Sequence, residues 1–251
     1  YQVTLMEKDS QLGGMVATLA LDPLTVEFRN LVDYLELQMK KLNIDVQLSK
    51  EVTADDVKAT SPDAVIMATG SYMKIPDEVK GAPAVLDHLE ALKNKDAIGQ
   101  RVVIWGFVYG AELALTLADM GKDVTLIDKA DRKGLTRHAA QGRKYWVARK
   151  LTDINVVRSA PEAQQLDNPK VLFRTKIKGI KDGGVKIKDE DGNKSVIPYD
   201  TLIISRRTKK RKDLLEKLKK AGVEIHRIGD CKKVGNIHRA IFSANEVARK
   251  I

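Results

Sequence analysis

Two acidic residues each stand directly after a short run of residues that predicts a β-strand. Asp128 closes the run Asp123–Ile127, and Glu7 closes the run Gln2–Met6 and is followed by Lys8. A carboxylate at the end of the second strand of a β–α–β unit is placed to accept hydrogen bonds from the ribose of a bound nucleotide. Glu7, Lys8 and Asp128 are therefore candidate cofactor-binding residues.

The residues before Asp128 predict a complete β–α–β unit. Arg101–Trp105 is a β-branched run that ends at Gly106, and Ala111–Met120 is apolar with helical spacing. Glycines between the strand and the helix let a pyrophosphate approach the backbone, and the helix N-terminus supplies free N–H groups. Gly106 and Gly110 are candidate cofactor-binding residues on this basis.

This glycine turn departs from the usual G-x-G-x-x-G pattern. If Gly110 is the third glycine, Trp105 and Phe107 occupy the first and second glycine positions. We expect these bulky side chains to stand where a phosphate would contact the backbone. Two alternatives stay open: a nicotinamide dinucleotide bound in the usual pose, or a β–α–β unit kept for its fold, with its pocket empty or holding a smaller ligand.

The unit that Glu7 closes lacks its first half in this sequence. The first strand, glycine turn and helix need about 30 residues, and the strand Gln2–Met6 is already at the start. We expect the sequence to be a fragment, or the sheet to be completed by another segment or subunit.

Two further stretches are candidates for contact with a ligand. Gly13 and Gly14 form a glycine pair that permits close backbone approach. Ala64–Ala68 predicts a parallel strand that is covered on both faces, and Thr69 and Gly70 follow it. Small residues at the carboxyl end of such a strand lie where α/β sheets meet their ligands.

The remaining runs predict alternating strands and helices. Helices are expected at about Val26–Leu42, after Thr53, at Asp87–Leu92, His138–Leu151, Lys212–Lys220 and Ile237–Ile251; strands at Ile44–Leu48, Asn155–Arg158, Asp200–Ser205 and Glu224–Ile228; and a β-meander at Val171–Ile177, Val185–Lys188 and Ser195–Pro198. The chain from Ser71 to Pro83 predicts a crossing to a second domain. The fold class is therefore α/β.

Composition limits the classes of function. The 251 residues carry a net charge of +10 and a single cysteine, Cys231, which excludes an internal disulfide or a redox CxxC pair. No apolar run approaches the roughly 20 residues of a membrane span, so we expect no membrane association. A reducing, cytoplasmic location fits this cysteine usage.

Several motifs in order resemble the flavoprotein oxidoreductases that have two dinucleotide-binding domains. The motifs are VTLMEKDSQLGG, PDAVIMATG, VVIWGFVYGAELALTLADMGKDVTLID, YDTLIIS and IGDC. The sequence is most similar to the C-terminal part of the 2,4-dienoyl-CoA reductase, 2-enoate reductase and trimethylamine dehydrogenase family. The segment LVDYLELQMKKLNIDVQL and the lack of a CxxC favour this family over disulfide reductases.

The resemblance implies two Rossmann-like domains with parallel sheets and a β-meander, one domain inserted in the other. Residues 1–76 plus 206–251 would form a discontinuous FAD-type domain without its first βα unit, and residues 77–205 an inserted NAD(P)-type domain. By position, Glu7 would bind the adenosine ribose of FAD, Gly13 and Gly14 would lie along the cofactor, and Ala68–Gly70 would pass near it at the sheet edge. Asp230, after Gly229, would hydrogen-bond the ribityl or pyrophosphate part of FAD.

The function implied is a flavin-dependent oxidoreductase region that passes electrons through FAD. Asp128 would bind the ribose of NAD(P)H or ADP in the second site. The alternative is a non-catalytic ADP-binding or assembly module of a larger electron-transfer complex, which the altered glycine turn motivates. FMN and an iron–sulfur cluster are implied only for a longer, family-like chain, and we expect an oligomer.

Other chemistry receives little support from the sequence. The four histidines lack metal-ligand spacing, so we expect no metal site and name no catalytic residue. Tyr145 and Trp146 are interpreted as core residues. The basic run Arg206–Lys212 contains no aromatic residue that could stack on bases, so nucleic-acid binding is not expected.

Overall fold

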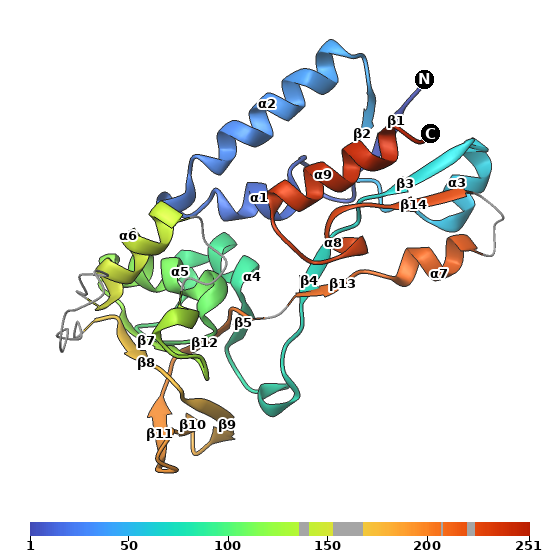
Figure 1. Cartoon of the computed structure of the whole chain (residues 1–251). Helices are drawn as coiled ribbons and strands as arrows, with labels where there is room; N and C mark the ends of the chain where they lie inside the picture. Colours follow the sequence, from blue (N-terminus) through green and yellow to red (C-terminus); the bar gives the residue numbers. More distant parts are fainter. Residues whose placement is uncertain (136–140, 153–167, 207, 220–223) are drawn as a thin grey trace. The chain divides into compact units, whose positions relative to one another are not determined.

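The chain forms two compact units in a computed structural model that describes residues 1–135, 141–152, 168–206, 208–219 and 224–251 (Figure 1). Unit 1 comprises Tyr1–Ala17, Glu27–Tyr72 and Thr208–Ile251; unit 2 comprises Thr18–Val26 and Met73–Arg207. Most of unit 2 is therefore one continuous insertion between two parts of unit 1. The assignment of FAD to one unit and NAD(P) to the other stays a prediction.

Unit 2 is built on a parallel sheet that is buried on both faces. Its five strands lie in the order β5 (Val85–Asp87), β12 (Thr201–Ile204), β6 (Arg101–Trp105), β7 (Asp123–Ile127) and β8 (Lys170–Leu172). Val102 and Ile104 pack into a core on one face, while Val103 and Trp105 pack into a second core on the other. The α/β fold class and the parallel β–α–β unit are therefore confirmed.

Helices cover this sheet, and a small meander packs beside it. Its helices are α4 (His88–Lys93), α5 (Phe107–Asp119) and α6 (Gln141–Thr152), with short 3-10 turns at Pro23–Thr25, Asp77–Val79, Lys95–Ala97 and Arg132–Gly134. The antiparallel meander is β9 (Lys176–Lys181), β10 (Gly184–Lys188) and β11 (Lys194–Pro198). The expected single strand Val171–Ile177 is wrong, because its first part is β8 of the parallel sheet and its last part begins β9.

Unit 1 contains short strand pairs instead of one sheet. Strand β1 (Thr4–Met6) pairs in parallel with β2 (Asp45–Gln47), and β3 (Ala64–Met67) pairs in parallel with β14 (Glu224–Arg227). Strand β4 (Ser71–Met73) pairs with β13 (Thr208–Lys210). The expectation that β3 is covered on both faces is wrong, since the Ile66 side chain is 47% exposed.

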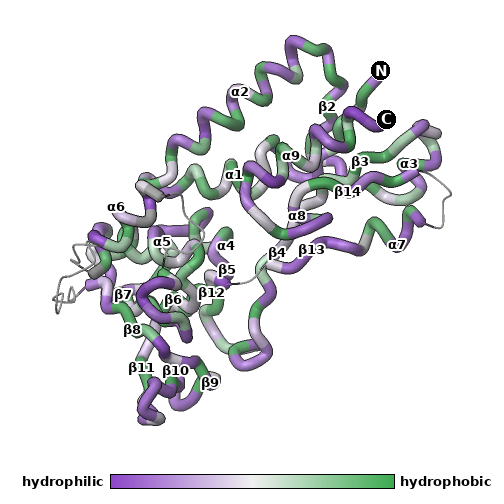
Figure 2. The backbone as a smooth tube through the Cα atoms, viewed as in Figure 1, coloured by the Kyte–Doolittle hydropathy of each residue, from purple (hydrophilic) through white to green (hydrophobic). Residues whose placement is uncertain are grey.

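Unit 1 also contains helices, some of which share a hydrophobic core with the β3–β14 pair. They are α1 (Gly14–Leu19, which crosses into unit 2), α2 (Phe28–Lys41), α3 (Ala54–Thr60), α7 (Asp213–Lys219), α8 (Gly229–Lys232) and α9 (Ile237–Ala248). Thr53 precedes α3 as the sequence predicts, and the structure adds a capping box between Thr53 and Asp56. Figure 2 shows alternating hydrophobic and hydrophilic residues along α2 and a hydrophilic β13.

Some expected elements lie outside the described residues. These are the start of the helix at residues 138–140, the strand at 155–158 and the end of the helix 212–220 at residue 220. The described part of the helix expected at His138–Leu151 is α6, which begins at Gln141. Tyr145 and Trp146 are both exposed on α6, so their interpretation as core residues is wrong.

An ion pair ties the beginnings of two central strands together. Asp200 precedes β12 and accepts hydrogen bonds from the Arg101 backbone N–H (2.8 Å) and guanidinium Nη2 (2.6 Å) at the start of β6. These bonds lower the pKa of the Asp200 carboxyl from 3.8 to about 2.

Asp200→Asn is expected to destabilise the protein at neutral pH. The folded-state pKa of Asp200 lies below its unfolded value, so its stabilisation is complete above about pH 4 and is lost as the pH falls towards 2. Urea unfolding at pH 7 and pH 3 measures the difference between wild type and variant, which should shrink at pH 3. Exposed Asp191→Asn serves as the control; an equal effect of the two variants would contradict the assignment.

Candidate nucleotide-binding sites

The turn between β6 and α5 requires glycine at one position. Gly106 has a φ of +120°, and a Cβ atom there would overlap the carbonyl oxygen of Ser205. Four residues later, a Cβ on Gly110 would lie 2.7 Å from Ile104 Cγ2, so this glycine lets α5 pack closely on β6. The two glycines therefore have the turn-forming and packing roles of a dinucleotide-binding turn.

The two bulky residues of this turn point into the core. Trp105 is 4% exposed and Phe107 is 1% exposed, and they belong to the cores on opposite faces of the sheet. The Phe107 ring meets Phe173 edge to face at 5.4 Å, and the Arg206 guanidinium lies 4.6 Å above the Trp105 ring. The expectation that these side chains stand in the phosphate position is therefore corrected: both rings are buried beside the turn.

Asp128 reaches from the end of β7 to the first turn of α5. Its Oδ2 accepts a hydrogen bond from the Phe107 backbone N–H (3.2 Å), and its Oδ1 accepts one from Ala130 (3.0 Å). A carboxylate at this place faces the positive end of the helix dipole and adjoins the strand end where a ribose binds. Gly106, α5 and Asp128 thus fit the adenosine half of a nucleotide.

The ends of β3 and β14 bring together a second group of predicted residues. The Ile228 N–H donates to Met67 O at 3.0 Å, so Ala68 and Gly229 follow paired strands. The Asp230 carboxylate accepts from Ser71 Oγ (2.8 Å) and from the Gly235 N–H (2.9 Å). This carboxylate is held at the strand ends by two donors.

The backbone segments next to Asp230 are exposed to solvent or have free space beside them. Ala68 and Thr69 are exposed, and Gly70 has a φ of +67° with no atom within 4 Å of a built Cβ. Gly229 has a φ of +55°, and its N–H donates to Ser243 Oγ (2.8 Å). The donor and acceptor set at this edge fits the sugar and phosphate portions of a nucleotide cofactor.

Glu7 and Lys8 belong to a separate strand pair. They follow β1, which pairs with β2, whereas Asp230 follows the β3–β14 pair. Glu7 Oε1 accepts from the Asp9 N–H (3.0 Å), and exposed Lys8 pairs with Asp9 at 3.9 Å. Both side chains are thus engaged within their own loop.

Gly13 and Gly14 have different surroundings. A Cβ on Gly13 would lie 2.9 Å from Ala17 and Val32 atoms, so Gly13 serves packing between the loop and the helices. A Cβ on Gly14 would meet nothing within 4 Å, which leaves room for a ligand. A binding role for either glycine stays a prediction.

A buried polar pair adjoins the Gly106 turn and was missed from the sequence. His88 begins α4, is fully enclosed, and its Nδ1 lies 3.2 Å from Ser205 Oγ. Burial lowers the pKa of His88 from 6.5 to about 3, so its ring is neutral at physiological pH. The sequence signal available was the capping box Asp87–Glu90, which places His88 at the helix start but does not indicate burial.

The described residues contain neither a candidate metal site nor a candidate membrane span. Within residues 1–135, 141–152, 168–206, 208–219 and 224–251, no group of three or more His, Cys, Asp or Glu residues is placed to hold a metal ion. In the same part of the chain no helix is both long and apolar enough to cross a membrane.

The parallel sheet, the glycine turn and Asp128 define a Rossmann-like nucleotide-binding fold. The family model for pyridine nucleotide-disulphide oxidoreductases matches residues 20–233, and the chain belongs to this family. Its relatives also bear out the resemblance to the C-terminal region of the enoate reductase and trimethylamine dehydrogenase flavoproteins. The domain is a redox enzyme domain of the FAD- and pyridine-nucleotide-binding type.

Two relatives with named activities are reductases. Bilirubin reductase of Mediterraneibacter gnavus is 28% identical over 96% of this chain and 36% of its own length. Cinnamate reductase of Clostridium sporogenes is 28% identical over the whole chain and 36% of its own length. The chain therefore spans just over a third of these relatives.

Solved structures show the same fold. A 2-naphthoyl-CoA reductase complex matches the whole chain and 36% of its own length with a TM-score of 0.81 and 26% identity. Histamine dehydrogenase from Rhizobium sp. 4-9 matches the whole chain and 40% of its own length with a TM-score of 0.79 and 22% identity.

His88→Gln is expected to flatten the pH dependence of stability. The folded-state pKa of His88 lies below the unfolded value, so the unfolded chain binds the extra proton, and stability falls as the pH drops from about 6.5 towards 3. Chemical unfolding at pH 7 and pH 5 should show a smaller loss in the variant than in wild type. Exposed His238→Gln is the matched control and should keep the wild-type slope; a slope lost in both variants would contradict burial as the cause.

Proposed function

We propose that this chain is the nucleotide-binding part of a flavin-dependent oxidoreductase, with FAD in unit 1 and an adenine-containing nucleotide in unit 2. The observation that supports it most directly is the Asp128 carboxylate, held across the Gly106 turn at the N-terminus of α5. FAD, when bound, supplies the electron-transfer chemistry, and the protein supplies position and electrostatics.

In unit 1, the proposed work of the chain is to orient FAD. Asp230, held by Ser71, would accept hydrogen bonds from ribityl hydroxyls, and Ala68–Gly70 would leave room beside it. Glu7 and Lys8 are proposed for the adenosine ribose, with Gly13 and Gly14 along the cofactor. These roles rest on the family resemblance together with the open strand ends.

In unit 2, Asp128 is proposed to bind the ribose of NAD(P)H. The alternative is that unit 2 binds ADP or serves assembly without hydride transfer. The departure of Trp105 and Phe107 from the glycine pattern motivates this alternative, and their rings, which lie in the core, do not themselves block a phosphate. A titration that compares NADH with ADP distinguishes the two, because only the first proposal requires binding of the nicotinamide half.

The complete protein is proposed to be larger than this region. The bilirubin and cinnamate reductases are about three times as long as this region, so an N-terminal segment or another subunit would complete the FAD site and add FMN or an iron–sulfur centre. An oligomer in a reducing, cytoplasmic location is part of the same proposal.

The first experiment is an absorbance spectrum of the native full-length protein, with released nucleotides identified by mass. Flavin bands and released FAD are the expected result, since the strand ends of unit 1 offer acceptors for the cofactor. ADP without flavin would support the assembly alternative. A complete protein that contains no flavin in any preparation would overturn the oxidoreductase proposal.

Asp128→Ala is expected to weaken adenine-nucleotide binding at least tenfold, because the ribose loses a charge-assisted acceptor worth about 1.5–3 kcal/mol. Isothermal titration of the native protein with NADH and ADP measures this loss. The matched control is Asp123→Ala, an exposed acid at the opposite end of the same strand, which should leave affinity unchanged. Equal affinities for wild type and Asp128→Ala would remove Asp128 from the site.

A further inference from the structure

The basic run that follows β12 forms an open pocket in unit 1. A cavity of about 510 Å³ is lined by Tyr72, Thr208, Lys209, Lys210, Lys212 and Val234, none of which is acidic. Lys209, Lys210 and Lys212 are exposed. We call this cavity the basic pocket.

The three lysines have no carboxylate partner in the part of the chain that the structure describes. Ion pairs there join other cations, such as Lys50 to Asp56 and Lys219 to Glu216. Lys232 and Lys233, at the end of α8 just before Val234, are exposed as well. Such a group of like charges attracts an anionic partner and repels itself in the absence of one.

The backbone under the basic pocket is a paired strand, and it lies beside the candidate FAD-binding strand ends. Strand β13 pairs with β4, and the Arg211 N–H donates to Gly70 O at 3.2 Å. Ser71 at the start of β4 donates to Asp230, and Val234 lines the pocket four residues beyond Asp230. A partner in the basic pocket would therefore sit next to residues 70 and 230.

We propose that the basic pocket is a docking surface for an acidic protein partner, whose carboxylates pair with Lys209, Lys210 and Lys212. Its lining holds one aromatic ring, Tyr72, with the Arg211 guanidinium 5.6 Å from the ring centre, whereas single-stranded nucleic acids are bound by several aromatic side chains on which successive bases stack. The charged groups are exposed, flexible ammonium groups, which suit electrostatic docking of a surface better than a closed site for one small anion. The proposal does not depend on FAD being bound.

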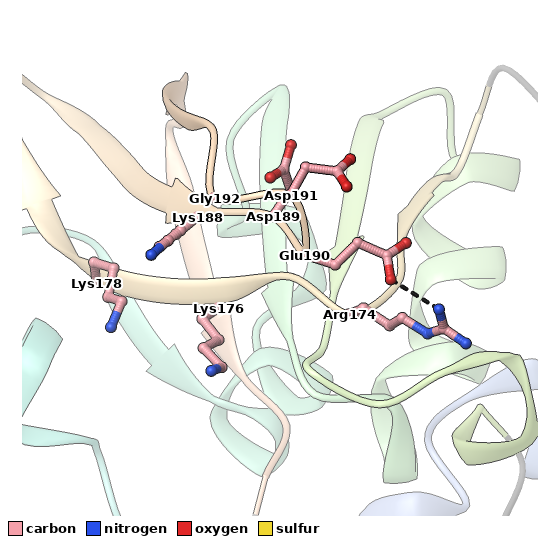
Figure 3. A pocket seen from close by; sticks show the side chains of 8 residues that line it. All are labelled: Arg174, Lys176, Lys178, Lys188, Asp189, Glu190, Asp191 and Gly192. Atoms are coloured by element: carbon pink, nitrogen blue, oxygen red, sulfur yellow. Dashed lines mark hydrogen bonds and ion pairs between the residues drawn. The ribbon is translucent and has the colours of Figure 1, made fainter.

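A second lysine-rich pocket in unit 2 provides a comparison within the same protein. Figure 3 shows Lys176, Lys178 and Lys188 around a cavity that also holds acidic residues of the β10–β11 turn. Its lining includes Asp189, Glu190 and Asp191, and Glu190 pairs with Arg174 at 2.8 Å. This pocket carries its own counter-charges, so it should attract an acidic partner far less.

The test compares two triple variants of the native full-length protein that remove the same number of charges. The first variant carries Lys209→Gln, Lys210→Gln and Lys212→Gln. The matched control carries Lys176→Gln, Lys178→Gln and Lys188→Gln. The probe is fluorescently labelled poly-glutamate, followed by anisotropy at low and at physiological salt, with single-stranded oligothymidine and inorganic phosphate as competing ligands. Thermal melting checks that both variants fold.

The expected result is at least a tenfold loss of poly-glutamate affinity in the first variant and less than a twofold loss in the control. Binding should also weaken as salt increases, because the contacts are exposed ion pairs. Equal losses in both variants would overturn the proposal, since net charge alone would explain them. Tighter binding of oligothymidine, or displacement of poly-glutamate by millimolar phosphate, would also overturn it in favour of a nucleic acid or a small anion.

Discussion

The backbone turn at Gly106 is the constraint on which the geometry of unit 2 depends. Its positive φ and its contact with the Ser205 carbonyl exclude any side chain. The Gly106 N–H donates to Ile127 O (2.9 Å), which fixes the end of β6 against the end of β7. The direction of α5 and the short distance between Asp128 and the Phe107 amide both follow from this turn.

Much of the fold could be predicted because its signals are local. The run Arg101–Trp105, the following helical spacing and the run Asp123–Ile127 predict β6, α5 and β7 within a few residues. Strand β5 is not predicted because three residues offer too little periodicity. Strands β8 and β9 are merged in the prediction because Phe173 and Thr175, which lie between them, are residue types that favour strands, and the positive φ of Arg174 that separates the strands leaves no signal in the sequence. The partition of strands between a parallel sheet and a meander depends on long-range pairing, which spacing does not indicate.

The candidate site could be predicted in residue identity but not in side-chain direction. The glycine pattern located Trp105 and Phe107 at the turn, yet successive side chains of a strand point to opposite faces, and the start of α5 turns the Phe107 ring into the core. His88 shows the same limit, since a helix-start position does not indicate whether neighbouring elements enclose it. Tyr145 and Trp146 show the opposite case: aromatic residues within a helix are predicted to lie in the core, and both are exposed.

The two best-placed acids share an arrangement that bears on binding. Asp128 accepts from Phe107 and Ala130, and Asp230 accepts from Ser71 and Gly235, so each carboxylate is fixed by two donors of its own unit. A carboxylate oxygen has two lone pairs, so one protein donor leaves it able to accept a further bond from a ribose or ribityl hydroxyl. Because the rotamers are already fixed, a ligand bound as proposed would gain these bonds without the cost of ordering the acid, which is the energetic advantage of a preorganised site.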